Sequence, residues 1–250
     1  MNIKKVLVSQ PKPASEKSPY FEIAEKYGVK IDFRPFIKVE SLSAKEFRQQ
    51  KVSILDHTAV IFTSRHAIDH FFHLCTELRV TIPETMKYFC TTEAVAMYLQ
   101  KHIVFRKRKI FYGTGTPASV IDLIGAKHKG EKFLITTSDS SSNEALTSLF
   151  QAQKLDFNTA VFVKSVPQDL KDIDIASYDM IVVYNPSDLK SLSENYPEYQ
   201  PGNTKFVTFG KQIVKAMEEA GLPVEIKAPT PEAPSVARAL ELYLDAHKND

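Results

Sequence analysis

The stretch AVIFTS at residues 59–64 has a counterpart in MIVVYN at residues 180–185, and this repeat decides the expected fold. Each stretch is a short β-branched or aromatic run that ends in hydroxyl or amide side chains, which is typical of a buried strand. Other segments, such as 65–78 and 211–220, space their apolar residues by three and four positions, as amphipathic helices do. Alternating strands and helices of this kind predict βαβ units around parallel sheets.

The repeat extends in both directions from this stretch. Downstream, FCTTEAVAM at 89–97 corresponds to FGKQIVKAM at 209–217, and TPASV at 116–120 corresponds to the segment 230–236. Upstream, each half begins with two further strand-like runs. Each copy is therefore expected to be a five-stranded α/β unit of flavodoxin-like size. The upstream runs are KKVLVSQ (4–10) with VKIDFRPFIKVE (29–40), and KFLITTS (132–138) with FNTAVFVKSVP (157–167).

The repeat alone leaves two domain arrangements open. The simpler one has two contiguous domains, residues 1–127 and 128–250. The segments 35–41 and 162–167 are both extended, however, and they could equally run as a pair of strands between domains that exchange parts of the chain.

Composition excludes several classes of protein. The 250 residues are 43% hydrophobic, which is ample for a large core, and 32 Lys+Arg against 30 Asp+Glu leave a net charge of +2. So small a charge does not indicate a nucleic-acid or membrane surface. Cys75 and Cys90 have no CxxC spacing, and no apolar stretch approaches the ~18 residues of a membrane span. We expect a cytoplasmic protein that binds neither nucleic acid nor membrane.

Candidate ligand-binding residues follow the expected strands. Ligands of open parallel sheets bind at the carboxyl ends of the strands, and here the loops consist largely of hydroxyl, amide and glycine residues. Such residues at helix starts suit carboxylate or phosphate ligands, although each loop by itself is better explained as a helix N-cap. Two sets of such loops favour an anion site. The loops are 63–65, 91–93, 113–117, 136–142, 185–188, 210–212 and 229–231.

Other chemistries have little support. The glycines of 113–115 lack the third glycine of a dinucleotide fingerprint, and neither a GxxxxGK[ST] nor a GxSxG motif occurs. His66, His70 and His73 lie at helical spacing, but they sit among aromatic and aliphatic residues with no carboxylate or cysteine partner nearby, so we expect no metal site. The basic run 106–109 is expected to be a solvated loop rather than a polyanion patch.

The order of these segments resembles the uroporphyrinogen-III synthase family over essentially the whole chain. The segments that carry the resemblance are VLVSQP, SPYFEIAEKYGVKIDFRPFIKVE, AVIFTSRHAIDHFF, AVFVKSVP, YDMIVVYNPSDLKSL, KFVTFGKQIVKAMEEAGLPV and APTPEAPSVARAL. The resemblance implies two flavodoxin-like parallel-sheet α/β domains with exchanged segments. Residues 1–40 and 168–250 would form one domain and 41–167 the other, joined by a two-stranded β-ladder with linkers near 35–41 and 162–167. We adopt this arrangement over the contiguous one.

The resemblance also implies a reaction. Hydroxymethylbilane, a linear tetrapyrrole with many carboxylates, loses water and closes into uroporphyrinogen III with inversion of ring D. The enzyme would be a monomeric cyclising hydro-lyase of porphyrin and heme biosynthesis that needs no cofactor. Because this substrate also cyclises unaided to the wrong isomer, the protein's main task would be to hold one conformation.

Carried over to this chain, the resemblance implies a set of substrate-binding residues. In addition, Lys211 and Tyr184 are candidate proton donors. The set is Thr63, Ser64, Arg65, Phe162, Asn185, Pro186, Ser187, Lys205, Gly210, Lys211, Gln212 and Thr230.

The chain departs from the family pattern at several of these positions. Phe162 stands where many members have a tyrosine proposed to assist water loss, and Gln212 with Ile213 replaces a Thr-Thr pair. Gln10 replaces an arginine, Asn185 replaces a serine, and residues 138–143 replace a glycine-rich loop. An alternative function is therefore a catalytically decayed two-lobed protein that binds a tetrapyrrole or another anion.

Overall fold

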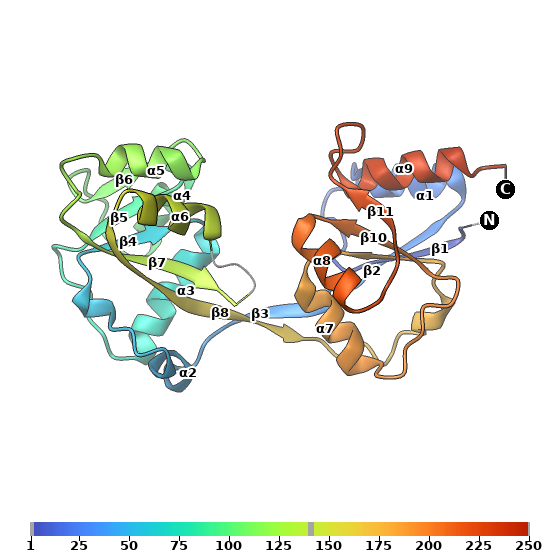
Figure 1. The fold of residues 1–250 in the computed structure, drawn as a ribbon, viewed down its shortest axis with the longest axis horizontal. Helices are drawn as coiled ribbons and strands as arrows, with labels where there is room; N and C mark the ends of the chain where they lie inside the picture. Colours follow the sequence, from blue (N-terminus) through green and yellow to red (C-terminus); the bar gives the residue numbers. More distant parts are fainter. Residues whose placement is uncertain (1–2, 140–142, 250) are drawn as a thin grey trace. The chain divides into compact units, whose positions relative to one another are not determined.

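The structure is a computed structural model that describes residues 3–139 and 143–249. The chain divides into two compact units (Figure 1): unit 1 comprises residues 1–38 and 165–250, and unit 2 comprises residues 39–164. Each unit is a parallel-sheet α/β domain, and strands from both ends of the chain share one sheet. The expected fold class, two parallel-sheet domains with exchanged segments, is confirmed.

Unit 1 contains a five-stranded sheet in the order β11-β10-β9-β1-β2, so the first two strands of the chain pack beside the last three. The exchange takes place where β1 pairs with β9, with Val6 opposite Met180. The strands are β1 (Lys5–Val8), β2 (Lys30–Phe33), β9 (Met180–Val183), β10 (Lys205–Phe209) and β11 (Val224–Ala228). The helices are α1 (Pro19–Tyr27), η3 (Ile175–Ser177), α7 (Pro186–Asn195), α8 (Lys211–Glu219) and α9 (Val236–Ala246).

Helices cover both faces of this sheet, which explains why its central strands are aliphatic along their whole length. Side chains alternate between the faces: Val6 and Val8 of β1 pack with α1 and α9, whereas Leu7 packs with α7 and α8. A strand buried on both faces has no solvent-facing side chain, so polar residues begin only where the strand ends.

Unit 2 contains a six-stranded sheet in the order β3-β8-β7-β4-β5-β6. Its core also has two layers: Val60 and Phe62 of β4 pack with α3, whereas Ile61 packs with α5 and α6. The strands are β3 (Ile37–Ser41), β4 (Ala59–Phe62), β5 (Lys87–Cys90), β6 (Ile110–Tyr112), β7 (Lys132–Ser138) and β8 (Asp156–Pro167). The helices are α2 (Ala44–Gln49), η1 (Ile54–Asp56), α3 (Arg65–Glu77), α4 (Glu93–Tyr98), η2 (Leu99–Lys101), α5 (Pro117–Ile124) and α6 (Glu144–Ala152).

Strands β3 and β8 form the ladder that connects the two units. Backbone hydrogen bonds join Gln168 N to Phe36 O at 2.9 Å and Leu42 N to Phe162 O at 3.0 Å. Residue numbers rise on one strand as they fall on the other, so the pair is antiparallel. Both connections between the units therefore run through one hydrogen-bonded pair of strands.

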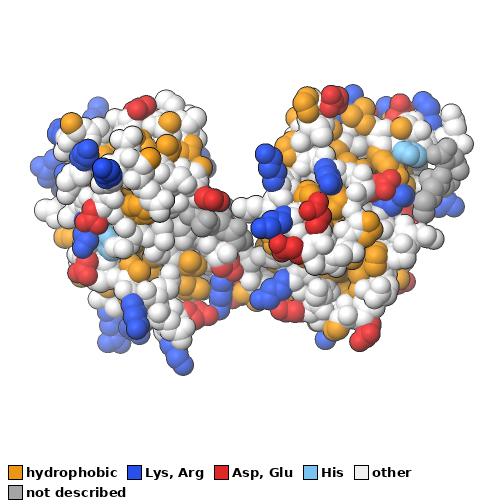
Figure 2. All heavy atoms as spheres, viewed as in Figure 1, with side chains coloured by type: hydrophobic (Ala, Val, Ile, Leu, Met, Phe, Trp, Pro, Cys, Tyr) orange, Lys and Arg blue, Asp and Glu red, His pale blue; other side chains and the backbone are white. Residues whose placement is uncertain are grey.

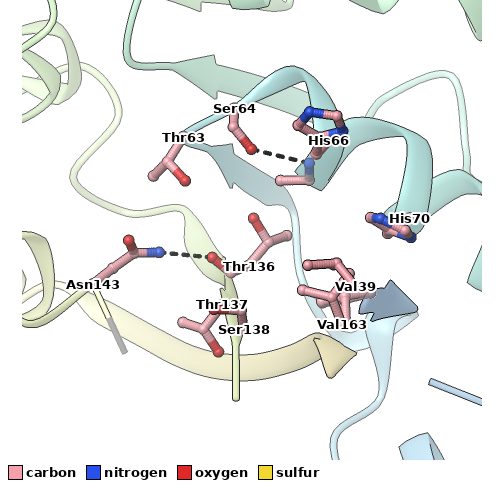
Figure 3. Close-up of a pocket in the computed structure, with 12 residues that line it drawn as sticks. Val39, Thr63, Ser64, His66, His70, Thr136, Thr137, Ser138, Asn143 and Val163 are labelled. Atoms are coloured by element: carbon pink, nitrogen blue, oxygen red, sulfur yellow. Dashed lines mark hydrogen bonds between the residues drawn. The ribbon is translucent and has the colours of Figure 1, made fainter. Parts of the chain in front are cut away.

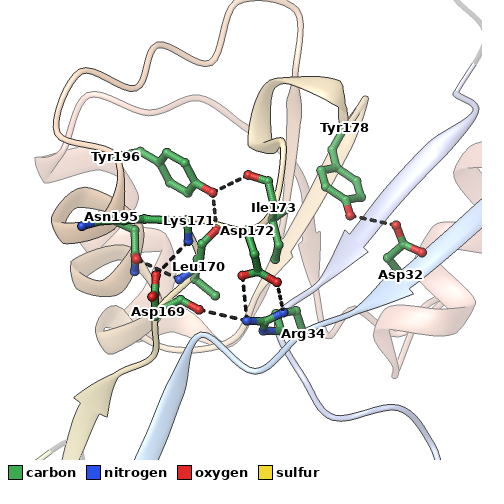
Figure 4. Close-up of polar contacts among 10 residues, drawn as sticks. All are labelled: Asp32, Arg34, Asp169, Leu170, Lys171, Asp172, Ile173, Tyr178, Asn195 and Tyr196. Atoms are coloured by element: carbon green, nitrogen blue, oxygen red, sulfur yellow. Dashed lines mark hydrogen bonds and ion pairs between the residues drawn. The ribbon is translucent and has the colours of Figure 1, made fainter.

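In unit 1, side chains fix the segment that follows β8 (Figure 4). Arg34, which follows β2, donates two hydrogen bonds to the Asp172 carboxylate and one to the carbonyl of Asp169, each at 2.9 Å. Asn195, at the end of α7, donates from its amide to the carbonyl of Gln168 at 2.8 Å. The chain that leaves the ladder is thus held to two different elements of unit 1.

In unit 2, the side chain of Gln50 takes the place of a neighbouring strand beside β8. Its amide nitrogen donates to the carbonyl of Val161, and its amide oxygen accepts from the N–H of Val161, both at 2.8 Å. A backbone neighbour would satisfy the same two groups, so this side chain continues the pairing of β8 beyond the end of β3.

Replacing Gln50 with alanine is expected to speed hydrogen exchange at the Val161 amide by roughly fivefold, because a lost hydrogen bond costs about 1 kcal/mol. Exchange followed by NMR would measure this effect. Gln49→Ala, which removes an exposed side chain one position earlier, is the matched control. Equal protection of Val161 in both variants would contradict the assigned contact.

Charges of both signs are interspersed on the face that Figure 2 shows. Lysine and arginine side chains are scattered over both units there, and acidic side chains lie among them. No helix within residues 3–139 and 143–249 combines the length and the apolar composition that crossing a membrane requires.

Candidate functional site

Unit 2 contains a pocket of about 230 Å³ where α3 begins and where β7 ends (Figure 3). The carboxyl ends of parallel strands meet at one edge of a sheet, which is where ligands of such sheets bind. All of the lining residues belong to unit 2. They are Val39, Thr63, Ser64, His66, Ala67, His70, Thr136, Thr137, Ser138, Asn143, Phe162 and Val163.

The start of α3 forms one wall of this pocket. Ser64 is the N-cap, and its hydroxyl oxygen accepts from the N–H of Ala67 at 3.1 Å. The first N–H groups of a helix lack partners within the helix, and its dipole favours an anion there. Thr63 and Ser64, both predicted from the sequence, line this wall, whereas the exposed Arg65 lies with its guanidinium 5.9 Å from the Tyr98 ring centre.

The end of β7 forms a second wall of the pocket. Residues 136–142 were among the predicted anion-binding loops, but none of them was in the predicted substrate-binding set. The Thr136 hydroxyl donates to the carbonyl of Ile61 at 2.9 Å, and the Thr137 hydroxyl donates to that of Ala160 at 3.0 Å. Asn143 donates from its amide to the carbonyl of Thr136 at 2.8 Å. These donors fix the wall, and their oxygens keep lone pairs that can accept from a ligand. Residues 140–142 of the loop lie outside the described residues.

Two histidines of α3 also line the pocket. The Nδ1 atom of His70 lies 2.5 Å from the hydroxyl oxygen of Ser41, which belongs to β3. Burial lowers the pKa of His70 below its ordinary value. Within the described part of the chain, no three histidine, cysteine or acidic side chains converge as metal ligands, and His73 is exposed on the same helix.

Unit 1 gathers most of its predicted residues at the carboxyl edge of its own sheet. Five neighbouring parallel strands end there, and the loop residues follow directly after β9, β10 and β11. The N–H of Gly210 donates to the carbonyl of Ala228 at 2.7 Å, which ties two of these loops together. Gly210 has a φ of +100°, a backbone region that favours glycine. The gathered residues are Tyr184, Asn185, Pro186, Ser187, Gly210, Lys211, Gln212 and Thr230.

A buried carboxylate organises this edge. Asp188 is fully buried, and its Oδ2 accepts from Ser9 Oγ at 2.9 Å, from Tyr184 N at 2.8 Å and from Asn185 N at 3.3 Å. Its Oδ1 has no hydrogen-bond partner among the described residues. Burial raises the pKa of Asp188. Asn185 and Asp188 form a capping box, a pattern that could have identified the residue from the sequence.

Tyr184, one of the two candidate proton donors, lies next to a second phenol. Its hydroxyl is 3.0 Å from that of Tyr20, and both side chains are partly buried. Burial raises the pKa of each phenol, so both remain neutral around pH 7. Lys211, the other candidate, is the exposed first residue of α8.

The structure does not bring Lys205 together with the other predicted residues. Lys205 begins β10, so it lies at the amino end of a strand whose carboxyl end leads to Gly210. Its Nζ atom lies 3.2 Å from the Glu225 carboxylate. Lys205 therefore belongs to the opposite edge of the sheet.

Two departures from the family pattern are core residues. Phe162 is 1% exposed and packs against the rings of Phe47 and Phe71 at centroid distances of 5.1 and 5.4 Å, while also contributing to the pocket wall. Ile213 is 1% exposed and packs beneath the sheet of unit 1. Neither residue supplies a hydrogen-bond donor from its side chain.

Comparisons with known proteins agree with this architecture. A family model described as uroporphyrinogen-III synthase HemD matches residues 18–238. A crystal structure of uroporphyrinogen-III synthetase from Helicobacter pylori 26695 is 14% identical with a TM-score of 0.55, over 98% of this chain and 100% of that one. A mutant uroporphyrinogen III synthase from the extremely thermophilic bacterium Thermus thermophilus is 13% identical with a TM-score of 0.51, over 99% and 100%. No curated protein sequence matches the chain.

Proposed function

The chain belongs to the uroporphyrinogen-III synthase HemD family, and from this premise we propose that it is a cyclising hydro-lyase that converts hydroxymethylbilane to uroporphyrinogen III. The observation that carries the proposal is the unit 2 pocket, whose wall is the start of a 13-residue helix beside Thr63 and Ser64. Backbone N–H groups and hydroxyls of this kind bind carboxylates, which the substrate carries in number.

The volume of the pocket limits how much of the substrate it can bind. A volume of about 230 Å³ is below the roughly 300–1,000 Å³ of sites that enclose a drug-sized ligand. We assign to it one pyrrole ring with its acid side chains. Holding one ring in a fixed orientation is sufficient to direct a substrate that is already reactive, because orientation alone lowers the barrier for the correct closure.

The proposed binding set excludes Lys205, because it lies at the far edge of its sheet, and assigns Phe162 to the pocket wall. Within unit 1 the proposed residues follow the central strands, and within unit 2 they lie at the start of α3. The set is Thr63, Ser64, Arg65, Asn185, Pro186, Ser187, Gly210, Lys211, Gln212 and Thr230.

The decisive test is to add the purified protein to hydroxymethylbilane, oxidise the products and separate the isomers. We expect isomer III to form in excess of the isomer I that arises without protein. If only isomer I forms, the proposed activity is wrong.

Replacing Thr63 with valine is expected to raise KM roughly tenfold, since a hydrogen bond to a charged group contributes about 1.5–3 kcal/mol. Steady-state kinetics of isomer III formation would measure the change. Thr76→Val is the matched control, because Thr76 is exposed near the far end of α3 and its hydroxyl donates to the carbonyl of Phe72. Equal KM values for the two variants would remove Thr63 from the binding set.

A second candidate function is binding of a tetrapyrrole without turnover. The observation that favours it is the pair of core residues Phe162 and Ile213, which offer no polar group where the family pattern has one. Tight binding of uroporphyrin together with formation of isomer I alone would support this function over the first.

A further inference from the structure

The unit 2 pocket contains two side chains that can transfer a proton near pH 7. Its described lining residues are otherwise hydroxyl, amide and apolar, and Phe162 carries no exchangeable proton. Imidazole is the side chain whose charge changes in this pH range, so His66 and His70 are the candidates. His66 is exposed in the first turn of α3, whereas His70 is partly buried one turn further along.

The orientation of His70 is fixed by a residue from another element. Ser41 of β3 lies with its hydroxyl oxygen 2.5 Å from Nδ1 of His70. The other ring nitrogen, Nε2, has no hydrogen-bond partner among the described residues, and the ring lines the pocket. If the serine donates to Nδ1, the neutral ring carries its proton on Nε2; in the charged ring, both nitrogens carry one.

We propose that His70, held by Ser41, donates the Nε2 proton to the hydroxyl group that leaves the substrate. This inference rests on the proposed function. The carbon–oxygen bond of the hydroxymethyl group breaks with its electron pair on oxygen, and the proton converts the leaving group to water. The lone pair of the pyrrole nitrogen stabilises the resulting carbon cation. This cation bonds to the α carbon of ring D that already carries a methylene bridge, and the older bond from that carbon to its bridge then breaks, which leaves the cation on the bridge carbon. The bridge carbon bonds to the free α carbon of ring D, which inverts the ring, and the proton lost from that α carbon returns to Nε2, so no oxidant or reductant is needed.

The surroundings of His70 on its own helix suit an acid. Burial lowers its pKa, His66 and His73 lower it further, and Asp69 opposes them. The Asp69 carboxylate is engaged elsewhere, since it accepts from the Tyr98 hydroxyl at 2.6 Å. An imidazolium with a lowered pKa gives up its proton more readily, and carboxylates of a bound substrate would favour the charged ring.

The neighbouring elements β3, β8 and α2 carry charged side chains, and one of them, Glu40 of β3, lies near enough to act on Lys164. Lys164 of β8 lies 2.8 Å from Glu46 of α2, so each charge is largely offset by the other. The remaining contributions of β3 and β8 to the pocket wall are Val39, Phe162 and Val163. These side chains are apolar, so they carry no competing titratable group.

The test compares His70→Gln with His73→Gln, a matched control three residues along the same helix with an exposed side chain. In His70→Gln, kcat for isomer III is expected to fall roughly 100-fold, the low end of what a general acid typically contributes, with little change in KM. In the wild type, kcat should fall as the pH rises through the pKa of His70 in the complex, and this dependence should disappear in His70→Gln. Unchanged kcat and pH dependence in His70→Gln would overturn the proposal.

The outcomes of these assays distinguish failure of the proposed function from failure of the role of His70. If the wild type forms no isomer III, the proposed function fails and this inference fails with it. If isomer III forms but His70→Gln behaves like His73→Gln, only the role of His70 is wrong. Should His70→Gln not fold, the ring signals of the wild type can be followed by NMR while uroporphyrin III is added. A shift confined to histidines of the pocket supports the proposal, and an unchanged His70 signal contradicts it.

Discussion

Replacing Phe162 with alanine is expected to destabilise unit 2 by about 4 kcal/mol, the usual cost of deleting a buried aromatic ring. The ring is 1% exposed and lies between Phe47 of α2 and Phe71 of α3, so its loss leaves a cavity beneath both helices. The free energy of unfolding of unit 2 can be obtained from hydrogen exchange of the slowest amides in β4 and β7.

Leu55→Ala is the control for this change. Leu55 is 52% exposed, so its truncation is expected to alter the free energy of unfolding by less than about 0.5 kcal/mol. A loss below about 1 kcal/mol in Phe162→Ala would mean that the site collapses around the cavity, and the ring would then be a ligand contact rather than a structural support.

Replacing Asp188 with alanine is expected to destabilise unit 1 by about 3 kcal/mol, because three donors would lose their acceptor and a buried unpaired donor costs about 1–3 kcal/mol. The donors are the hydroxyl of Ser9 and the N–H groups of Tyr184 and Asn185. Asp188→Asn keeps an acceptor oxygen at this place and is the matched control. Exchange of the slowest amides in β1 and β9 would report the loss, and equal stability of the two variants would contradict it.

The same residue predicts a pH dependence. Burial raises the pKa of Asp188 in the folded protein above its unfolded value. Its contribution to stability is therefore complete below the unfolded pKa and is lost as the pH rises through the folded pKa. Relative to Asp188→Asn, the wild type should become less stable as the pH rises from about 4, the ordinary aspartate pKa, through the raised pKa of Asp188 in the folded protein. A difference in the free energy of unfolding that grows in favour of the wild type over this range would show the opposite sign.

The strands and helices could be predicted from the sequence because aliphatic runs and helical spacing are local patterns. The pairing of β1 with β9 could not be derived in the same way. All central strands of a parallel sheet buried on both faces carry similar aliphatic runs, so nothing in a run such as residues 6–8 identifies its neighbour. The exchange came from the family resemblance instead.

The candidate site could be predicted only for residues that directly follow a predicted strand. Thr63 and Gly210 were identified because each follows a strand, and their roles as ligand contacts stay predictions. Lys205 precedes its strand, so the same rule would have assigned it to the opposite edge. From the sequence, His70 was considered only as a metal ligand, because the contact of its ring with Ser41 of β3 is visible only in the fold.

The discontinuity of unit 1 affects how the chain folds during its synthesis on the ribosome. On the ribosome, β1 and β2 emerge before residues 39–164, and their sheet partners β9, β10 and β11 emerge last. The aliphatic strand β1 therefore lacks its partner β9 while unit 2 is made. An exposed strand of this kind favours aggregation. Once unit 2 has folded, the β3–β8 ladder holds Phe36 next to Gln168. The strands that were made first then pair with those made last as if only a short loop joined them.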